Sequence, residues 1–210
     1  MSLKEYSTIK GEASSHLVIS KSKFVGFAKN VESPKQAAEV LETIKKKNWD
    51  ADHNCYAYII GKNKEHMKFS DDGEPSGTAG IPMLEVLKKS GLTDILTVST
   101  RHFGGIKLGA GGLVRAYSLS VSEILKNAEK QKFVPCNIFK QAVEYDVWAK
   151  IEPRVTASGA IVFSKEYLEK VYLKVGLKEN DELKIRTIFR EALKTDEVLE
   201  FIETDYVIEN

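Results

Sequence analysis

The sequence has few cysteines, no strong charge bias and no long hydrophobic run, and each absence excludes a class of protein. Its two cysteines, Cys55 and Cys136, are too few for a disulfide framework or a cysteine-rich zinc site, so we expect both to be reduced thiols. No stretch approaches the roughly 18 consecutive apolar residues that span a bilayer. The first residues, MSLKEYSTIK, contain no signal-peptide run. We therefore expect a cytoplasmic protein that does not contact a membrane.

Charge is balanced over the whole chain but not along it. The 210 residues carry 31 basic and 30 acidic side chains and are 42% hydrophobic, which is typical of a globular protein and excludes a polycationic nucleic-acid binder. Residues 1–136 hold 20 basic and 15 acidic side chains, whereas residues 137–210 hold 11 and 15. This shift, with Pro135 after the last long helical pattern, predicts two domains, 1–134 and 137–210, and a short connector at 134–136.

The second half alternates extended and helical patterns in an order that indicates its fold. Extended patterns cover 138–146, 160–164, 171–177 and 198–208, and helical patterns cover 147–158 and a segment that Asn180 can cap. The order β-α-β-β-α-β over about 70 residues is the ferredoxin-like plan. This plan by itself names no function.

The first half predicts an α+β sandwich. Ser33, Pro34 and Gln36 have the spacing of a capping box that starts a helix. Further helices are predicted at 82–90 and 112–130, the latter with Leu113, Tyr117, Ser120, Ile124 and Ala128 on its inner face, and strands at 17–19, 24–28, 54–61 and 95–100.

Two glycine-rich loops, 70–82 and 101–115, are the candidate functional segments. Nine of the 14 glycines lie between Gly73 and Gly112. Each loop leads into a helix, whose first N–H groups lack backbone partners and favour an anion. Neither loop contains a P-loop or a dinucleotide-binding fingerprint.

The charged residues of these loops have two interpretations, which remain open at this point. In one, an acidic residue of the first loop pairs with Arg101 or Arg115 and holds the loops together. In the other, the basic residues and loop amides bind an external phosphate or acidic group. The candidate binding residues are Asp71, Asp72, Glu74, Ser76, Thr78, Arg101, His102, Lys107 and Arg115. The candidate loop-shaping residues are Gly73, Gly77, Gly104, Gly105, Gly109, Gly111 and Gly112.

Two other patterns are weaker candidates. His53 and Cys55 share a face of a predicted strand, which suggests an activated thiolate. A buried, unreactive cysteine is the interpretation that we favour for a run such as NCYAYII. The lysines 45–47 at a helix end favour interaction with the helix dipole over nucleic-acid binding. No HxxxH or CxxC pattern supports a metal site.

Three motifs together resemble the IMPACT family, whose bacterial members are of the YigZ type: DHNCYAY at 52–58, SDDGEPSGTAGIPMLEVL at 70–87 and TRHFGGIKLGAGGLVRAY at 100–117. The resemblance covers nearly the whole chain. It implies an N-terminal domain like the second domain of a small-subunit ribosomal protein and a C-terminal domain similar to the last domain of elongation factor G. Eukaryotic relatives regulate translation by competing for a protein partner, and no catalytic residue or cofactor is implied.

The resemblance and the residues together predict a non-enzymatic, translation-associated regulator. It would bind RNA, a ribosomal surface or a translation-related protein, with charge supplied by Arg101, Lys107, Arg115, Lys88 and Lys89. The alternative is an enzyme that acts on a phosphorylated small molecule or nucleotide, in which Asp71 or Asp72 would serve as metal ligand or base. The oligomeric state is not predicted.

Overall fold

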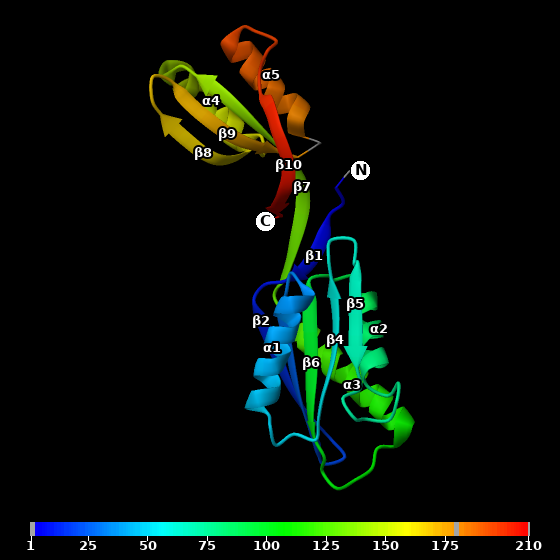
Figure 1. Cartoon of the computed structure of the whole chain (residues 1–210). Helices are drawn as coiled ribbons and strands as arrows, with labels where there is room; N and C mark the ends of the chain where they lie inside the picture. The colour runs from blue at the N-terminus through cyan, green and yellow to red at the C-terminus, as the bar shows by residue number, and fades with distance from the viewer. Residues whose placement is uncertain (1–2, 179–180, 210) are drawn as a thin grey trace. The chain divides into compact units, whose positions relative to one another are not determined.

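A computed structural model describes residues 3–178 and 181–209, which form two compact units. The first unit comprises residues 6–132, and the second comprises 133–178 and 181–209 together with 3–5. The first unit contains β1 (Tyr6–Ile9), β2 (Glu12–Ile19), β3 (Ser22–Asn30), α1 (Pro34–Lys47), β4 (His53–Ile60), β5 (His66–Ser70), α2 (Gly80–Ser90), β6 (Ile95–His102) and α3 (Gly109–Asn127) (Figure 1).

The first unit is built on an antiparallel sheet with strand order β2-β3-β6-β4-β5. Helices α2 and α3 pack on one face over the larger core, and α1 packs on the other face over a smaller one. The central strand β6 is buried along seven of its eight residues because helices cover both of its faces. Arg101 and His102, the last residues of β6, therefore lie where the buried part of the sheet meets its end.

Local signals explain where α1 and α3 form. Ser33 accepts a hydrogen bond from the Gln36 N–H at 3.2 Å and Pro34 starts α1, as the capping box predicts. In α3, Leu113, Tyr117, Ser120 and Ile124 are buried on the predicted inner face. The helix begins at residue 109 instead of the predicted 112, and it ends at residue 127 instead of 130.

The second unit contains β7 (Lys130–Val143), α4 (Tyr145–Ala157), β8 (Ile161–Tyr167), β9 (Val171–Leu177), α5 (Glu182–Leu193) and β10 (Glu200–Ile208), and β7 begins in the first unit. Its antiparallel strands are ordered β10-β7-β9-β8, the arrangement of a β-α-β-β-α-β plan. Asn180, the expected cap of α5, lies outside the described residues.

One expectation about local structure is wrong, and the short strands β1 and β5 were not predicted. Residues 134–136 form no connector but lie within β7, where Val134 and Cys136 pack against Val207. The short strand β5 was not predicted, because it is an edge strand with four exposed residues and so lacks the alternation of a half-buried strand.

Replacement of Gly26 tests the close packing of β3 on α3. A Cβ at this position would lie 2.6 Å from Ile124 Cγ1 and 2.5 Å from Ser15 Oγ. Gly26→Ala should therefore destabilise the first unit by about 1–3 kcal/mol, the usual cost of overpacking. Chemical denaturation measures the loss, and Ser14→Ala on the exposed face of β2 should change the free energy of unfolding by less than about 0.5 kcal/mol. An equal loss of unfolding free energy in both variants would contradict the close packing of Gly26 against α3.

Candidate functional site

Three loops meet at one end of the first unit, where β6 ends. We call residues 20–23, 48–52 and 102–108 the loop end, which lies at the bottom of this unit in Figure 1. The Phe103 N–H donates to Asp52 Oδ2 at 2.7 Å, and the Gly104 N–H donates to Ser22 Oγ at 3.2 Å. A Cβ on Gly104 would lie 2.1 Å from the carbonyl of Lys21, so only glycine fits this contact. The three loops are therefore one connected structure.

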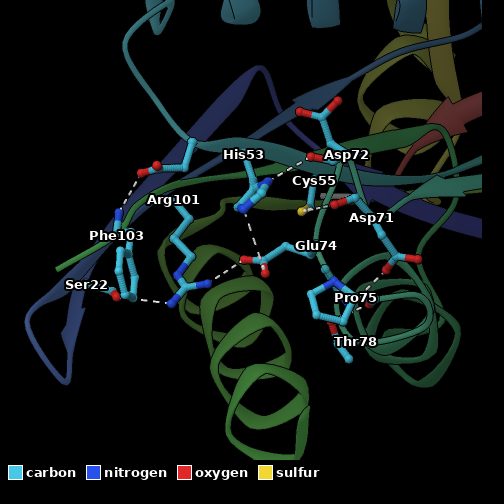
Figure 2. Close-up of polar contacts among 12 residues, drawn as sticks. Ser22, His53, Cys55, Asp71, Asp72, Glu74, Pro75, Thr78, Arg101 and Phe103 are labelled. Atoms are coloured by element: carbon cyan, nitrogen blue, oxygen red, sulfur yellow. Dashed lines mark hydrogen bonds and ion pairs between the residues drawn. The ribbon is translucent and has the colours of Figure 1, made fainter. Parts of the chain in front are cut away.

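A buried ion pair lies directly behind the loop end (Figure 2). Arg101 Nη1 donates to Glu74 Oε1 at 2.7 Å, and the two side chains are only 6% and 3% exposed. Tyr117 Oη donates to the same carboxylate oxygen at 2.7 Å. Glu74 and Arg101 thus pair with each other and hold the two glycine-rich loops together, which is the first of the two interpretations given above. Neither side chain is accessible to an external ligand.

Aromatic rings hold the Arg101 guanidinium in place. Its Cζ lies 5.6 Å from the centroid of Phe24 and 5.4 Å from that of Phe103, both distances within the range of cation–π contacts. Arg101 Nη2 donates to Ser22 Oγ at 3.2 Å. Phe103 remains 46% exposed, so Arg101 supports the ring of a surface aromatic from inside.

Asp71 caps α2 from a distance along the chain. Its carboxylate accepts hydrogen bonds from the N–H groups of Gly77, Ala79 and Gly80 at 2.8–3.0 Å. Burial alone would raise the pKa of Asp71, but the three backbone donors outweigh it and lower the pKa below its ordinary value. This carboxylate satisfies the start of the helix and is not oriented toward an external metal or substrate.

Asp72 and His53 fasten the first loop to the sheet. Asp72 Oδ1 pairs with Lys45 Nζ at 2.6 Å, and Oδ2 accepts from the Asn54 N–H at 2.7 Å. His53 Nδ1 donates to the Asp72 carbonyl at 2.9 Å, which directs Nε2 toward Glu74 Oε2 at 3.9 Å (Figure 2). Both carboxylate oxygens of Asp71 and of Asp72 are thus engaged within the chain.

Cys55 does not have the environment of a nucleophile. Its side chain is fully buried, and Sγ donates to the Asp71 carbonyl at 2.9 Å. Burial, reinforced by nearby carboxylates and only partly offset by a hydrogen bond with Tyr117, raises the pKa of the Cys55 thiol to about 12. The thiol is therefore protonated at neutral pH.

The remaining predicted residues divide between surface and interior. Ser76, Lys107 and Arg115 are exposed, and Thr78 is buried, with its hydroxyl donating to the Pro75 carbonyl at 2.6 Å. His102 is half-buried, with Nδ1 3.9 Å from Asp50 Oδ2. Arg115 forms no ion pair within the described residues, so the internal-pairing interpretation does not extend to it. Positive φ angles occur at Gly73, Gly77, Gly105 and Gly109, but not at Gly104, Gly111 or Gly112.

Sequence reasoning missed several exposed side chains of the loop end. Lys21 lies in the turn between β2 and β3, Lys23 follows it in β3, and Trp49 follows α1 with 84% of its surface exposed. The sequence shows a tryptophan close to three lysines, 45–47. It does not show that Trp49 is exposed, or that the segment carrying it lies against residues 101–103.

Neither a metal site nor a membrane span is apparent in the described part of the chain. Residues 3–178 and 181–209 contain no group of three or more His, Cys, Asp or Glu side chains arranged to hold a metal ion. No helix within the same ranges is long and apolar enough to cross a bilayer.

Removal of either partner of the buried ion pair should destabilise the first unit strongly. Glu74→Met or Arg101→Met leaves an uncompensated buried charge, so each should cost about 3–5 kcal/mol in chemical denaturation. The double variant should cost much less than the sum, because neither charge is then left without its partner. Lys46→Ala breaks the exposed pair with Glu42 and should cost at most about 1 kcal/mol. Additive single effects would contradict the pairing.

The Asp71 cap should make stability dependent on pH. Asp71→Ala removes the acceptor of three N–H groups and should cost about 1–2 kcal/mol at pH 7. Because folding lowers the pKa of Asp71, its contribution is complete above the unfolded value of about 3.9 and is lost as pH falls through the lower folded value. The stability difference between wild type and Asp71→Ala, measured by denaturation from pH 7 to about pH 3, should therefore shrink with acidification. A constant difference would contradict the cap.

Comparison with known proteins places these motifs in a family. The Impact N-terminal domain matches residues 20–125. The IMPACT family member YvyE of Bacillus subtilis is 44% identical over 179 residues, which cover 85% of this chain and 82% of YvyE. YigZ of Escherichia coli is 35% identical over 161 residues, which cover 76% of this chain and 79% of YigZ. A crystal structure of a hypothetical protein has a TM-score of 0.62 and 29% identity, and the match covers 95% of this chain and 98% of that one. These matches confirm the resemblance, and the chain belongs to the IMPACT family.

Proposed function

We propose that this protein is a translation-associated regulator that binds RNA through the loop end and the adjoining first turns of α3. The observation that carries the proposal is a group of exposed cations without ion-pair partners among the described residues, on the segments that form the loop end and on the neighbouring turns of α1 and α3, together with the exposed side chain of Phe103. The Glu74–Arg101 pair contributes indirectly, because it holds the loops and the ring from inside.

The charge of this surface comes from several segments. Lys21, Lys23, Lys47, Lys107 and Arg115 are all exposed, and none forms an ion pair within the described residues. The nearby carboxylate of Asp52 accepts the Phe103 N–H. Cations that are not neutralised by their own chain can contact phosphate groups and release the counterions condensed on RNA.

Phe103 adds a contact that a purely electrostatic surface lacks. Its ring is 46% exposed and is supported on the inner side by Arg101. An exposed aromatic ring on the same loop as an exposed lysine, here Lys107, suits RNA, because bases can stack on the ring while phosphates meet the cation.

The described residues of the second unit carry less unpaired positive charge than those of the first unit. Residues 137–210 hold 11 basic and 15 acidic side chains. Several of its lysines are paired with carboxylates: Lys140 with Glu200, Lys150 with Asp146, Lys165 with Glu152, Lys170 with Glu144 and Lys174 with Glu203. These pairs leave less positive charge for phosphate, so we assign RNA binding to the first unit.

The link to translation rests on the family. Membership in the IMPACT family, in which eukaryotic relatives regulate translation, supports ribosomal RNA as the first ligand to test. RNA binding and a protein partner are separate proposals, and the unpaired cations favour RNA.

The salt dependence of RNA binding tests the proposal. The affinity of the full chain for ribosomal RNA should fall steeply with salt, because each phosphate contact releases counterions. Lys107→Ala with Arg115→Ala should weaken binding and reduce the slope of log K against log salt by about 2, or about 1 for each lost cation. Filter binding or fluorescence anisotropy over a salt series gives both quantities.

A matched control removes the same charge elsewhere. Lys150→Ala with Lys170→Ala lies in the second unit and should leave affinity and slope unchanged. Absence of binding by the intact protein, or an equal effect of both double variants, would refute RNA binding at the loop end.

A further inference from the structure

Trp49 is the most exposed large hydrophobic side chain in the described part of the chain. Its exposed fraction is 84%, above that of Leu183 at 76% and Val18 at 71%. A tryptophan has a large apolar surface, and at this exposure folding gives almost none of the burial that usually stabilises it. The core of the first unit therefore does not require an aromatic ring at this position.

The turn that carries Trp49 is held by hydrogen bonds on both sides. Asn48 donates to the Ile44 carbonyl through its N–H at 3.0 Å and its side-chain amide at 2.9 Å. On the other side, the Ala51 N–H donates to the Asn48 carbonyl at 3.1 Å, and the Asp52 N–H donates to the Arg101 carbonyl at 3.1 Å. Because the backbone is fixed, a ligand that covers the indole orders little more than one side chain, which keeps the entropic cost of binding low.

A groove begins beside this turn and runs along the sheet. It has a volume of about 460 Å³, within the range of small-ligand sites, and lies between α1 and the strands β2 and β3. Lys47 and Asn48, which directly precede Trp49, line it together with His16, Phe27 and Lys29. The groove thus offers the ring of Phe27, hydrogen-bonding groups and the charge of Lys47, whereas Lys29 is paired with Glu12, which also lines the groove.

These features suit unpaired nucleotides better than a duplex. In a duplex the base faces are stacked on one another, and a ring on a protruding turn meets only the backbone. In a single strand the bases are free to stack on aromatic side chains while lysines follow the phosphates. Accepting the RNA-binding function proposed above, we infer that Trp49 and Phe103 are stacking platforms for unpaired RNA nucleotides, and that the strand continues into the groove beside α1.

The intrinsic fluorescence of the protein provides a direct test. The chain has two tryptophans, and Trp148 is only 3% exposed, so a ligand that stacks on the surface should quench Trp49 alone. A short oligouridylate should quench the emission and bind the full chain at least about tenfold more tightly than an RNA duplex of equal length. Trp49→Ala should remove the quenching and weaken oligouridylate binding roughly tenfold, whereas Trp49→Phe should retain most of the affinity.

Control variants separate stacking from general surface effects. Tyr167→Ala removes a ring of the second unit that is 55% exposed and should leave binding and quenching unchanged. The slope of log K against log salt should be the same for Trp49→Ala and wild type, because the substitution removes no charge.

The possible failures are distinguishable. Absence of salt-dependent binding to every RNA would overturn the proposed function itself. Salt-dependent binding without quenching, or with equal affinity for oligouridylate and duplex, would overturn the stacking inference alone. Anionic phospholipid vesicles form a last arm, because an exposed Trp beside lysines also suits a membrane surface. Vesicle binding with a blue shift of Trp49 emission, without a response to oligouridylate, would likewise overturn the stacking inference.

Discussion

The ion pair between Glu74 and Arg101 is the contact on which the arrangement of the loop end depends. It joins two glycine-rich loops that are separated by α2 and most of β6, and both side chains are nearly inaccessible to solvent. Such a pair costs desolvation energy, so its value lies less in net stability than in fixing one arrangement of the loops. Tyr117, Ser22 and the rings of Phe24 and Phe103 complete the surroundings of the two charges.

The charged residues of the IMPACT motifs fall into two sets, one engaged in contacts within the chain and one exposed to solvent. Glu74, Arg101 and the carboxylates of Asp71 and Asp72 are engaged within the chain, where they cap α2 and fasten the loops to the sheet. The exposed set includes the cations Lys107 and Arg115. The same glycine-rich motifs thus supply both an internal support and exposed cations, and the proposed RNA binding rests on the exposed cations.

Sequence reasoning was most successful where the signal is local. The capping box at Ser33, the buried face of α3 and the β-α-β-β-α-β order depend on neighbouring residues or on periodicity, and all three occur in the structure. Sequence reasoning was less successful where a residue far away in the chain determines the local structure. α2 begins two residues before the expected Pro82, and its first N–H groups are satisfied by Asp71. The choice of Glu74 as the partner of Arg101, and the approach of the Trp49 turn to β6, are long-range contacts that no spacing encodes.

The central claim is that the loop end, and not the second unit, is the part of this protein that contacts RNA. Ultraviolet crosslinking of the full chain to ribosomal RNA, followed by mass spectrometry of the crosslinked peptides, tests this claim most directly. The account predicts that crosslinks fall in peptides containing residues 20–23, 47–52 and 103–115. Crosslinks confined to residues 137–210 would contradict it.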